Sequence, residues 1–227
     1  MLYYPIFLDL RGRRCAVVGG GCVAERKVMA LLRAGANVRL VSPSVTPRLA
    51  LLAARGRIEL SPRAYRPGDL EGPQSEPSEG RSGVRPVLVF AATDDPETQK
   101  AIRKDAEKIG ALVNAADGAR ESDFIVPASF SQGDLQVAVS TSGASPTLAR
   151  RLRRPLQVTV GREYRGYLRF LRGARKHIMD TVPDEAQRAK IFRQLAGGPV
   201  IDWIWKVSPP RAAQDAKKWL EKVTGTE

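Results

Sequence analysis

The sequence is poor in the residues that build metal centres and disulfide frameworks. It holds two cysteines and one histidine among 227 residues. Cys15 and Cys22 form neither a CxxC pair nor part of a ligand cluster, so we expect two small packing residues in a reducing compartment. His177 stands in a basic run, residues 175–177, which is typical of a solvated helix surface. We therefore expect no metal site.

Long apolar runs are also missing. No stretch approaches the roughly 20 apolar residues that cross a bilayer. Residues 1–12 lack the basic n-region and the small-residue cleavage site of a secretory signal. The hydrophobic content of 43% is ordinary for a globular chain. The sequence thus favours a soluble, cytoplasmic protein with no membrane partner.

Acidic residues are scarce in the last third of the chain. Residues 150–227 hold 18 Lys or Arg against 8 Asp or Glu, a net charge of +10, whereas residues 1–149 hold 19 against 16, a net charge of +3. Such a field attracts nucleic acid, anionic membrane or a carboxylate-rich small molecule, although a solvated helical surface would have the same composition. Aromatic residues make up only 6%, and no helix-turn-helix or RNA-binding signature is present, so we expect no nucleic-acid partner.

What the sequence does contain is a glycine triplet between a short apolar run and a helix-like pattern. A strand, a glycine turn and a helix form the first unit of a dinucleotide-binding fold. We expect Gly19 to allow the tight turn, Gly21 to let the backbone approach a pyrophosphate, and Ala24 to let the helix pack closely on the strand. Cys22 and Val23 belong to the helix start, whose N–H groups would face the phosphates.

The end of the second strand, residues 37–41, is expected to lie at the ribose. An acidic residue commonly holds the ribose hydroxyl there, but the sequence has Ser42, Pro43 and Ser44. No arginine suited to a 2′-phosphate follows directly. We expect the serines or backbone groups to hold the ribose, and we favour NAD as the cofactor.

A short strand is expected at residues 58–60, and two carboxylates follow a fourth expected strand, residues 87–92. Thr93 and Asp94 lie at its carboxyl end and are expected to line the nucleotide pocket. Asp95 is placed to cap a helix that begins at Pro96. A pair of carboxylates would also suit acid–base catalysis, but capping accounts for Asp95.

The pattern of elements predicts an α/β chain in three parts. A Rossmann-like NAD-binding domain spans residues 1–113, and a small β-hairpin module, with expected strands at 124–127 and 135–140, spans residues 114–149. A basic helical domain spans residues 150–227. Residues 72–83 are rich in Pro, Gly, Ser and Glu and are expected to form a surface loop.

Two further segments are candidates for binding. Asp117 follows the strand expected at 111–114, at the ligand-binding edge of such a sheet, although an Asp-Gly pair also favours a plain surface turn. The hydroxyl-rich run 140–147 leads into a helix. It would either cradle carboxylates or simply cap that helix.

These residues together resemble the precorrin-2 dehydrogenases of siroheme biosynthesis, including those that also act as sirohydrochlorin ferrochelatases. The matching runs lie in order at residues 4–10, 17–27, 91–95, 114–117, 123–128, 133–135 and 139–153. The resemblance implies NAD-dependent oxidation of precorrin-2 to sirohydrochlorin by a homodimer whose middle module pairs the subunits. The substrate carries eight carboxylates, which would account for the basic last third.

The resemblance also assigns roles to individual residues. It implies that Asp117 is the catalytic carboxylate, which orients or deprotonates the macrocycle. The implied substrate-binding residues are Asn114, Ser140, Thr141, Ser142, Gly143, Ser145 and Arg150. Iron insertion, if it occurs, would have Asp117 as its only protein base.

Several features depart from the family or leave alternatives open. The 72–83 loop is longer than usual, residues 155–164 differ from the helical run expected there, and the tail beyond 201 matches nothing informative. A non-enzymatic dinucleotide sensor would use the same glycine loop, with Asp117 dispensable for any chemistry. Turnover of precorrin-2 separates the two readings.

Overall fold

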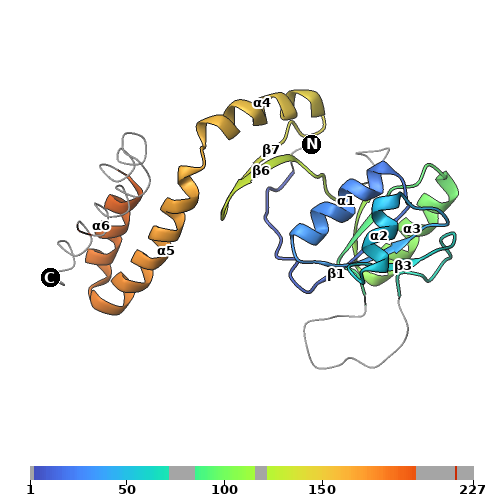
Figure 1. Ribbon diagram of the computed structural model, residues 1–227, viewed down its shortest axis with the longest axis horizontal. Coiled ribbons are helices and arrows are strands. Elements are labelled where there is room, and N and C mark those ends of the chain that lie inside the picture. The colour runs from blue at the N-terminus through green and yellow to red at the C-terminus, as the bar shows by residue number, and fades with distance from the viewer. Residues whose placement is uncertain (1–2, 72–84, 116–121, 198–217, 219–227) are drawn as a thin grey trace. The chain divides into compact units, whose positions relative to one another are not determined.

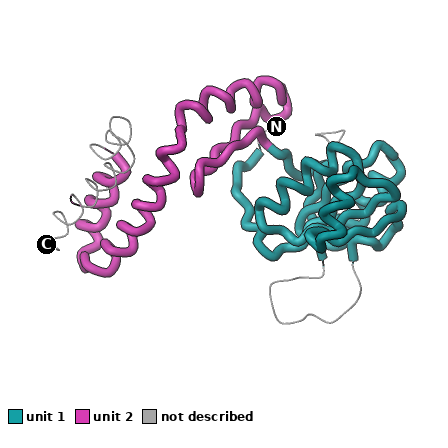
Figure 2. Tube along the Cα trace, viewed as in Figure 1, with its two compact units in different colours: residues 1–126 teal, residues 127–227 magenta. Residues whose placement is uncertain are grey.

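A computed structural model describes residues 3–71, 85–115, 122–197 and 218. The chain divides into two compact units, residues 1–126 and residues 127–227 (Figure 2). Each unit has its own core, so each is described by itself. Among the described residues, no helix is both long and apolar enough to span a bilayer.

Unit 1 is built on a five-stranded parallel sheet (Figure 1). Its strands are β1 Arg14–Val18, β2 Asn37–Val41, β3 Glu59–Ser61, β4 Leu88–Ala91 and β5 Leu112–Ala115. The order across the sheet is β3-β2-β1-β4-β5, so β1 lies between β2 and β4. This confirms the Rossmann-like fold. It also creates a switch point between β1 and β4, where such sheets bind ligands.

The two faces of β1 explain how the helices are distributed. Cys15 and Val17 face a core that includes residues of α1 (Cys22–Arg33) and α2 (Pro47–Ala54). Ala16 and Val18 face a second core that includes residues of α3 (Pro96–Ile109). Successive strand residues point to opposite faces, and an apolar run therefore buries both faces of the sheet.

The expected helix start after β4 is confirmed. Asp95 is the N-cap of α3, its carboxylate accepts a hydrogen bond from the Thr98 N–H at 3.0 Å, and Pro96 opens the helix. At the other end Gly110 adopts a left-handed conformation with φ of 71°. These residues satisfy backbone groups that the helix itself leaves without partners.

Residues 122–126 belong with the parallel sheet. The backbone N–H of Val113 donates to the Asp123 carboxylate, and the Asp123 N–H donates to the Val113 carbonyl, both at 2.8 Å. Phe124 then packs edge-on against Phe90, with ring centroids 5.4 Å apart. These contacts hold residues 122–126 in unit 1, so the contact boundary falls after Val126.

Unit 2 begins with the expected hairpin, but the prediction for its first strand was wrong. The strands are β6 Ala128–Gln132 and β7 Leu135–Val139, not residues 124–127 and 135–140. Gln132 pairs with Leu135 across a two-residue turn in which Gly133 has φ of +63°. That short turn sets the register of the hairpin. Phe124, which was expected in the first strand, packs against Phe90 instead.

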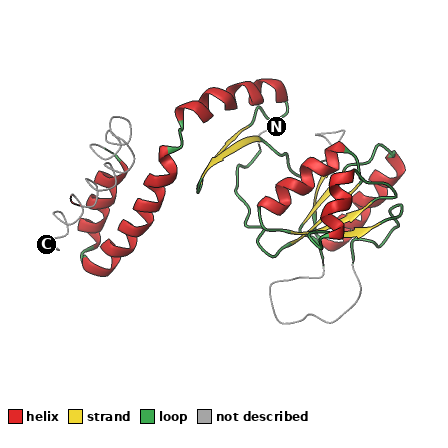
Figure 3. Ribbon diagram, in the orientation of Figure 1, coloured by secondary structure: helices red, strands yellow, loops and turns green. Residues whose placement is uncertain are grey.

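The rest of unit 2 that the structure describes is helical (Figure 3). Helix α4, Pro146–Thr159, packs on the hairpin and continues through Pro155. Helices α5, Glu163–Thr181, and α6, Glu185–Ala196, pair around a small core. Within it, the buried Tyr167 hydroxyl donates to the Leu195 carbonyl.

Candidate functional site

A pocket of about 550 Å³ opens at the carboxyl ends of the central strands of unit 1. Its walls come from the loops that follow β1, β2, β3 and β4 and from the first turn of α3. The lining residues are Val18, Gly19, Gly20, Gly21, Val23, Val41, Ser42, Pro43, Ser44, Ala64, Tyr65, Ala92, Thr93, Asp94, Asp95 and Thr98. The pocket therefore lies at the β1/β4 switch point.

The three glycines of the loop have different surroundings. Gly19 has φ of +113°, and a Cβ there would lie 2.1 Å from the Ala92 carbonyl oxygen. At Gly20 a Cβ would lie 1.8 Å from the Ser44 carbonyl oxygen. At Gly21 a Cβ would meet nothing within 4 Å. The first two glycines thus let three loops pack together, whereas the third leaves open space beside the pocket.

The start of α1 suits an anionic group. Gly21 is the N-cap and provides no side-chain hydrogen bond to the first turn. The first N–H groups of a helix have no partner within the helix, and the helix dipole favours negative charge near them. Ala24 is fully buried against the sheet, while Cys22 is exposed at the helix start, so the expectation of a packing role was wrong for Cys22. The residues present therefore fit the pyrophosphate of a dinucleotide.

The loop after β2 is shaped by Ser42. This residue is only 5% exposed, and its hydroxyl donates to the Ser44 carbonyl at 2.7 Å. Ser42 therefore holds the turn that closes over Gly20. Its hydroxyl oxygen retains acceptor capacity for a ligand.

The charged residues that line the described pocket are two carboxylates, Asp94 and Asp95. A hydrogen bond from the Thr98 hydroxyl, together with the Thr98 N–H, lowers the pKa of Asp95 below its ordinary value. Arg63 precedes the lining residue Ala64, but its guanidinium holds both oxygens of Asp69, at 2.6 and 2.7 Å. The described lining thus provides negative charge and no cation of its own.

Asn114 lies at the end of β5 with its side-chain amide engaged. Its Oδ1 accepts a hydrogen bond from Lys27 Nζ at 3.1 Å, and its Nδ2 donates to the Phe124 carbonyl at 2.9 Å. Lys27 Nζ also lies 5.1 Å from the centroid of the Phe90 ring. Burial, and secondarily the charge of Arg26, lowers the pKa of Lys27. Asn114 thus joins α1 to β5. Its assignment to the substrate stays a prediction.

The hydroxyl-rich run belongs to unit 2 and forms a compact turn before α4. The Ser140 hydroxyl oxygen accepts from the Ser142 N–H, and Thr141 Oγ1 accepts from the Ser145 N–H, both at 3.0 Å. Ser145 caps α4 by accepting from the Leu148 N–H at 3.1 Å. Helix capping, one of the two roles considered for this run, is therefore observed.

Three other predicted substrate residues also fall at or beyond this turn. Ser142 and Gly143 have positive φ, 51° and 88°, so the chain reverses sharply between them. Arg150 is exposed and donates to the Thr147 hydroxyl at 3.3 Å. Asp117, the predicted catalytic residue, lies outside the described residues. Among the side chains that are described, no group of three or more His, Cys, Asp or Glu gathers where a metal ion could bind.

Sequence reasoning missed several lining residues. Gly20 belongs to the glycine triplet, so its place beside the assigned glycines was a usable signal. Tyr65 and Thr98 enter the pocket from the loop after β3 and from the first turn of α3. Thr98 comes three residues after the predicted cap Asp95, so helix geometry was a usable signal, whereas the approach of Tyr65 depends on strand order, which no local pattern contains.

Two family models match the chain. The family described as putative NAD(P)-binding matches residues 6–128, which include the whole parallel sheet. The family described as sirohaem biosynthesis protein central matches residues 132–159, which include β7 and α4. The first match covers more than half of the chain.

Relatives and a solved structure agree with these matches. The chain is 37% identical over 218 residues to a siroheme synthase of Chromobacterium violaceum, covering 96% of the chain and 44% of that protein. It is 34% identical over 221 residues to a siroheme synthase of Thioalkalivibrio sulfidiphilus, covering 97% of the chain and 42% of that protein. The chain thus spans less than half the length of these relatives. The solved structure of SirC, a precorrin-2 dehydrogenase, matches with a TM-score of 0.76 and 26% identity, covering 97% of this chain and 100% of that one.

Proposed function

The chain belongs to the family of NAD(P)-binding proteins of siroheme biosynthesis, and on that premise we propose that it oxidises precorrin-2 to sirohydrochlorin with NAD. The observation that carries the proposal is the likeness to a precorrin-2 dehydrogenase over the full length of that protein. The pocket at the β1/β4 switch point supports it, because the glycine loop and the α1 start fit a dinucleotide.

The proposed reaction balances as a two-electron oxidation. The macrocycle loses a hydride and a proton, and NAD⁺, when bound, takes the hydride to become NADH. The helix start after Gly21 would hold the pyrophosphate. Asp117 would orient the macrocycle and accept the proton. In the sequence Asp117 stands two residues after Ala115, the last residue of β5, and ligands of such sheets bind at the carboxyl ends of the strands, which supports this role.

NAD, and not NADP, is part of the proposal. The described lining provides two carboxylates, Asp94 and Asp95, and no cation that could hold a 2′-phosphate, and Arg63 is already held by Asp69. Like charges at close range repel, and a phosphate without a cation partner gains little from burial. We therefore expect tighter binding of NAD than of NADP, measured as the two dissociation constants by titration calorimetry.

A homodimer is the proposed assembly. The described face of α4 carries Leu148, Leu152 and Leu156 at a spacing of four residues, each between 41% and 46% exposed. A leucine stripe at helical spacing is the kind of surface that a second subunit buries. Leu152→Glu should raise the fraction of monomer in analytical ultracentrifugation. An unchanged dimer would remove this stripe from the interface.

The test of the activity is an anaerobic assay of the purified chain with precorrin-2 and NAD. We expect NADH and sirohydrochlorin to appear in equal amounts, each measured by its own absorption spectrum. A dinucleotide sensor would bind NAD without forming either product. That outcome would contradict the proposed activity.

A further inference from the structure

The loop after β3 forms one wall of the pocket, and two buried or half-buried carboxylates tether it. This loop, residues 62–71, is called the strap below. Ala64 and Tyr65 of the strap line the pocket. The strap connects the edge strand β3 to residues on the α3 side of the sheet, since Leu70 is buried in the core that contains Ile102.

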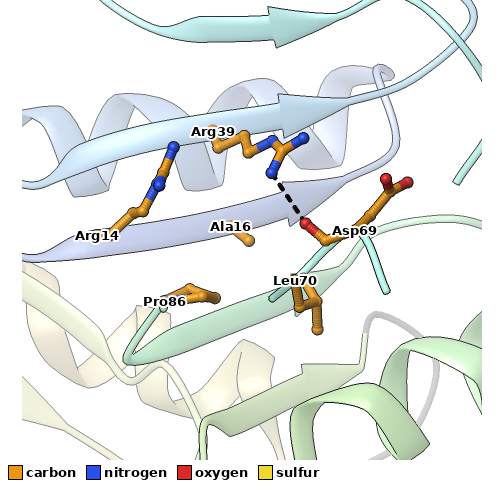
Figure 4. A pocket seen from close by; sticks show the side chains of 6 residues that line it. All are labelled: Arg14, Ala16, Arg39, Asp69, Leu70 and Pro86. Atoms are coloured by element: carbon orange, nitrogen blue, oxygen red, sulfur yellow. Dashed lines mark hydrogen bonds between the residues drawn. The ribbon is translucent and has the colours of Figure 1, made fainter. Parts of the chain in front are cut away.

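Asp69 fixes the middle of the strap. Its carboxylate accepts two hydrogen bonds from Arg63 and one from the Arg66 N–H at 2.7 Å. Its backbone carbonyl accepts from Arg39 of β2 at 2.9 Å, the contact drawn as a dashed line in Figure 4. In that view Arg39 reaches across the sheet toward Asp69, with Leu70 beside it. The strap is therefore tied to β2 as well as to itself.

Asp105 of α3 is the second tether. Its side chain is only 2% exposed, and Oδ2 accepts from the Tyr65 hydroxyl and from the Gly68 N–H, both at 2.7 Å. A buried carboxylate is costly unless hydrogen bonds compensate it. Two of its donors come from the strap. Burial, followed by the hydrogen bond to Asp105, raises the pKa of Tyr65, so the phenol stays a donor at neutral pH.

The strap faces a particular half of the expected ligand. It follows β3, which pairs with β2, and the loop after β2 contributes Ser42 and Ser44 to the same pocket. In dinucleotide-binding sheets the end of β2 lies at the adenosine ribose. The Tyr65 hydroxyl donates to the buried Asp105, its side chain packs against the core that contains Ile102, and the residue lines the pocket together with the loop after β2.

From this geometry we propose that Tyr65 is the wall against which the adenine of the dinucleotide packs, and that Asp105 is the positioning residue that holds it there. The ligand class is an adenine nucleotide with a diphosphate, such as NAD or ADP-ribose. The inference rests on the dinucleotide binding in the proposed function, but it does not depend on the substrate that is oxidised.

The experiment measures dissociation constants of NAD and ADP-ribose for the full chain and its variants by titration calorimetry. Tyr65→Ala should weaken both ligands on the order of tenfold, because the aromatic face is lost. Tyr65→Phe and Asp105→Asn keep the ring but disturb its tether, and each should weaken both ligands by roughly two- to fivefold. Asp105→Asn in the Tyr65→Ala background should add nothing further.

If Asp105→Asn causes no further loss of affinity in the Tyr65→Ala background, Asp105 acts by positioning Tyr65 and not through general stability. A merely structural Asp105 would lower the unfolding temperature of either background without this dependence on Tyr65. Tyr167→Phe is the matched control, since it also removes a buried tyrosine hydroxyl bond, but in unit 2. It should leave both dissociation constants unchanged. Tyr65→Phe also provides a second route if Asp105→Asn does not fold.

The outcomes distinguish this inference from the proposed activity. Unchanged affinities in folded Tyr65→Ala would overturn it, as would weaker NAD binding with unchanged ADP-ribose binding. A wild-type chain that binds NAD but never oxidises precorrin-2 would contradict the proposed activity. Weaker binding of NAD and ADP-ribose by the variants would still support the roles of Tyr65 and Asp105. A wild-type chain that binds neither ligand would overturn both.

Discussion

At the scale of single residues, the glycine loop combines two kinds of glycine. Gly19 and Gly20 lie where any side chain would overlap a backbone carbonyl of a neighbouring loop, whereas Gly21 borders open space. The first kind is required for the loops to pack, and the second for a ligand to approach. Stability and affinity should therefore respond to different positions in one short segment.

The first prediction contrasts two alanine substitutions. Gly20→Ala places a methyl group against the Ser44 carbonyl and should cost about 1–3 kcal/mol of stability through overpacking. Gly21→Ala should remain within about 1 kcal/mol of the wild type, since this N-cap position has room. It should nonetheless weaken NAD binding, because the methyl group occupies space that the pyrophosphate would use. Urea unfolding and calorimetry test the pair. The reverse pattern would contradict the assigned roles.

The second prediction concerns the two thiols. Cys15 is fully buried, and burial raises its pKa to about 11, so little thiolate is available at neutral pH. Cys22 is exposed at the start of α1. Iodoacetamide should therefore modify Cys22 alone in the folded protein, and NAD should slow that reaction. Mass spectrometry of the labelled peptides reads the result. Equal labelling of both thiols, or no protection by NAD, would be inconsistent with this site.

At the scale of elements, the strap depends on an ionised carboxylate. Burial by itself would raise the pKa of Asp69, but the hydrogen bonds from Arg63 and the Arg66 N–H, with the charges of Arg63 and Arg39, lower it below 3.8. A carboxylate with a lowered folded-state pKa contributes stability above its unfolded value and loses that contribution as the pH falls through the folded value.

The third prediction follows from the lowered pKa of Asp69. Wild-type stability should fall as the pH drops below 3.8, while Asp69→Asn should lose less over the same range because its side chain does not titrate. Thermal unfolding across an acid pH series is the measurement. Parallel curves for the two proteins would show that Asp69 does not carry the effect.

The elements differ in how far local sequence determines them. The parallel strands of unit 1 and the Asp95 cap were predicted because their signals are local: apolar runs, and a capping residue followed by proline. The first strand of the hairpin was not, because residues 124–127 are as apolar as a strand. In the structure Phe124 packs against Phe90 and the turn at Gly133 sets the pairing, so the strand begins at Ala128.

The candidate site divides in the same way. The glycine loop is contiguous, so its residues could be assigned from the sequence, as could Ser42 at the end of β2. Tyr65 and Asp105 are 40 residues apart and meet only because the strap crosses to the α3 side of the sheet. Long-range pairs of this kind depend on strand order and loop path. Neither hydrophobic periodicity nor a local motif in the sequence predicts such pairs.

At the scale of the whole molecule, the charge is divided unevenly along the chain, with +10 in residues 150–227. For a substrate that carries eight carboxylates, this field should act mainly on encounter and binding. The fourth prediction is that KM for precorrin-2 rises steeply with salt, while the dissociation constant of NAD rises less, because exposed charges are screened. Steady-state kinetics at several salt concentrations test it. A KM independent of salt would assign the basic residues to another role.

The central claim is that this chain oxidises precorrin-2 and that Asp117 serves the chemistry. The most direct measurement compares the wild type, Asp117→Ala and the control Asp134→Ala in an anaerobic turnover of precorrin-2 with NAD, alongside NAD binding by each protein. Asp134 is an exposed carboxylate paired with Arg172. We expect equal NADH and sirohydrochlorin from the wild type and the control. Asp117→Ala should be slower by about a hundredfold or more, with NAD binding unchanged. Full turnover by Asp117→Ala would remove this residue from the chemistry, and NAD binding without any wild-type turnover would contradict the dehydrogenase itself.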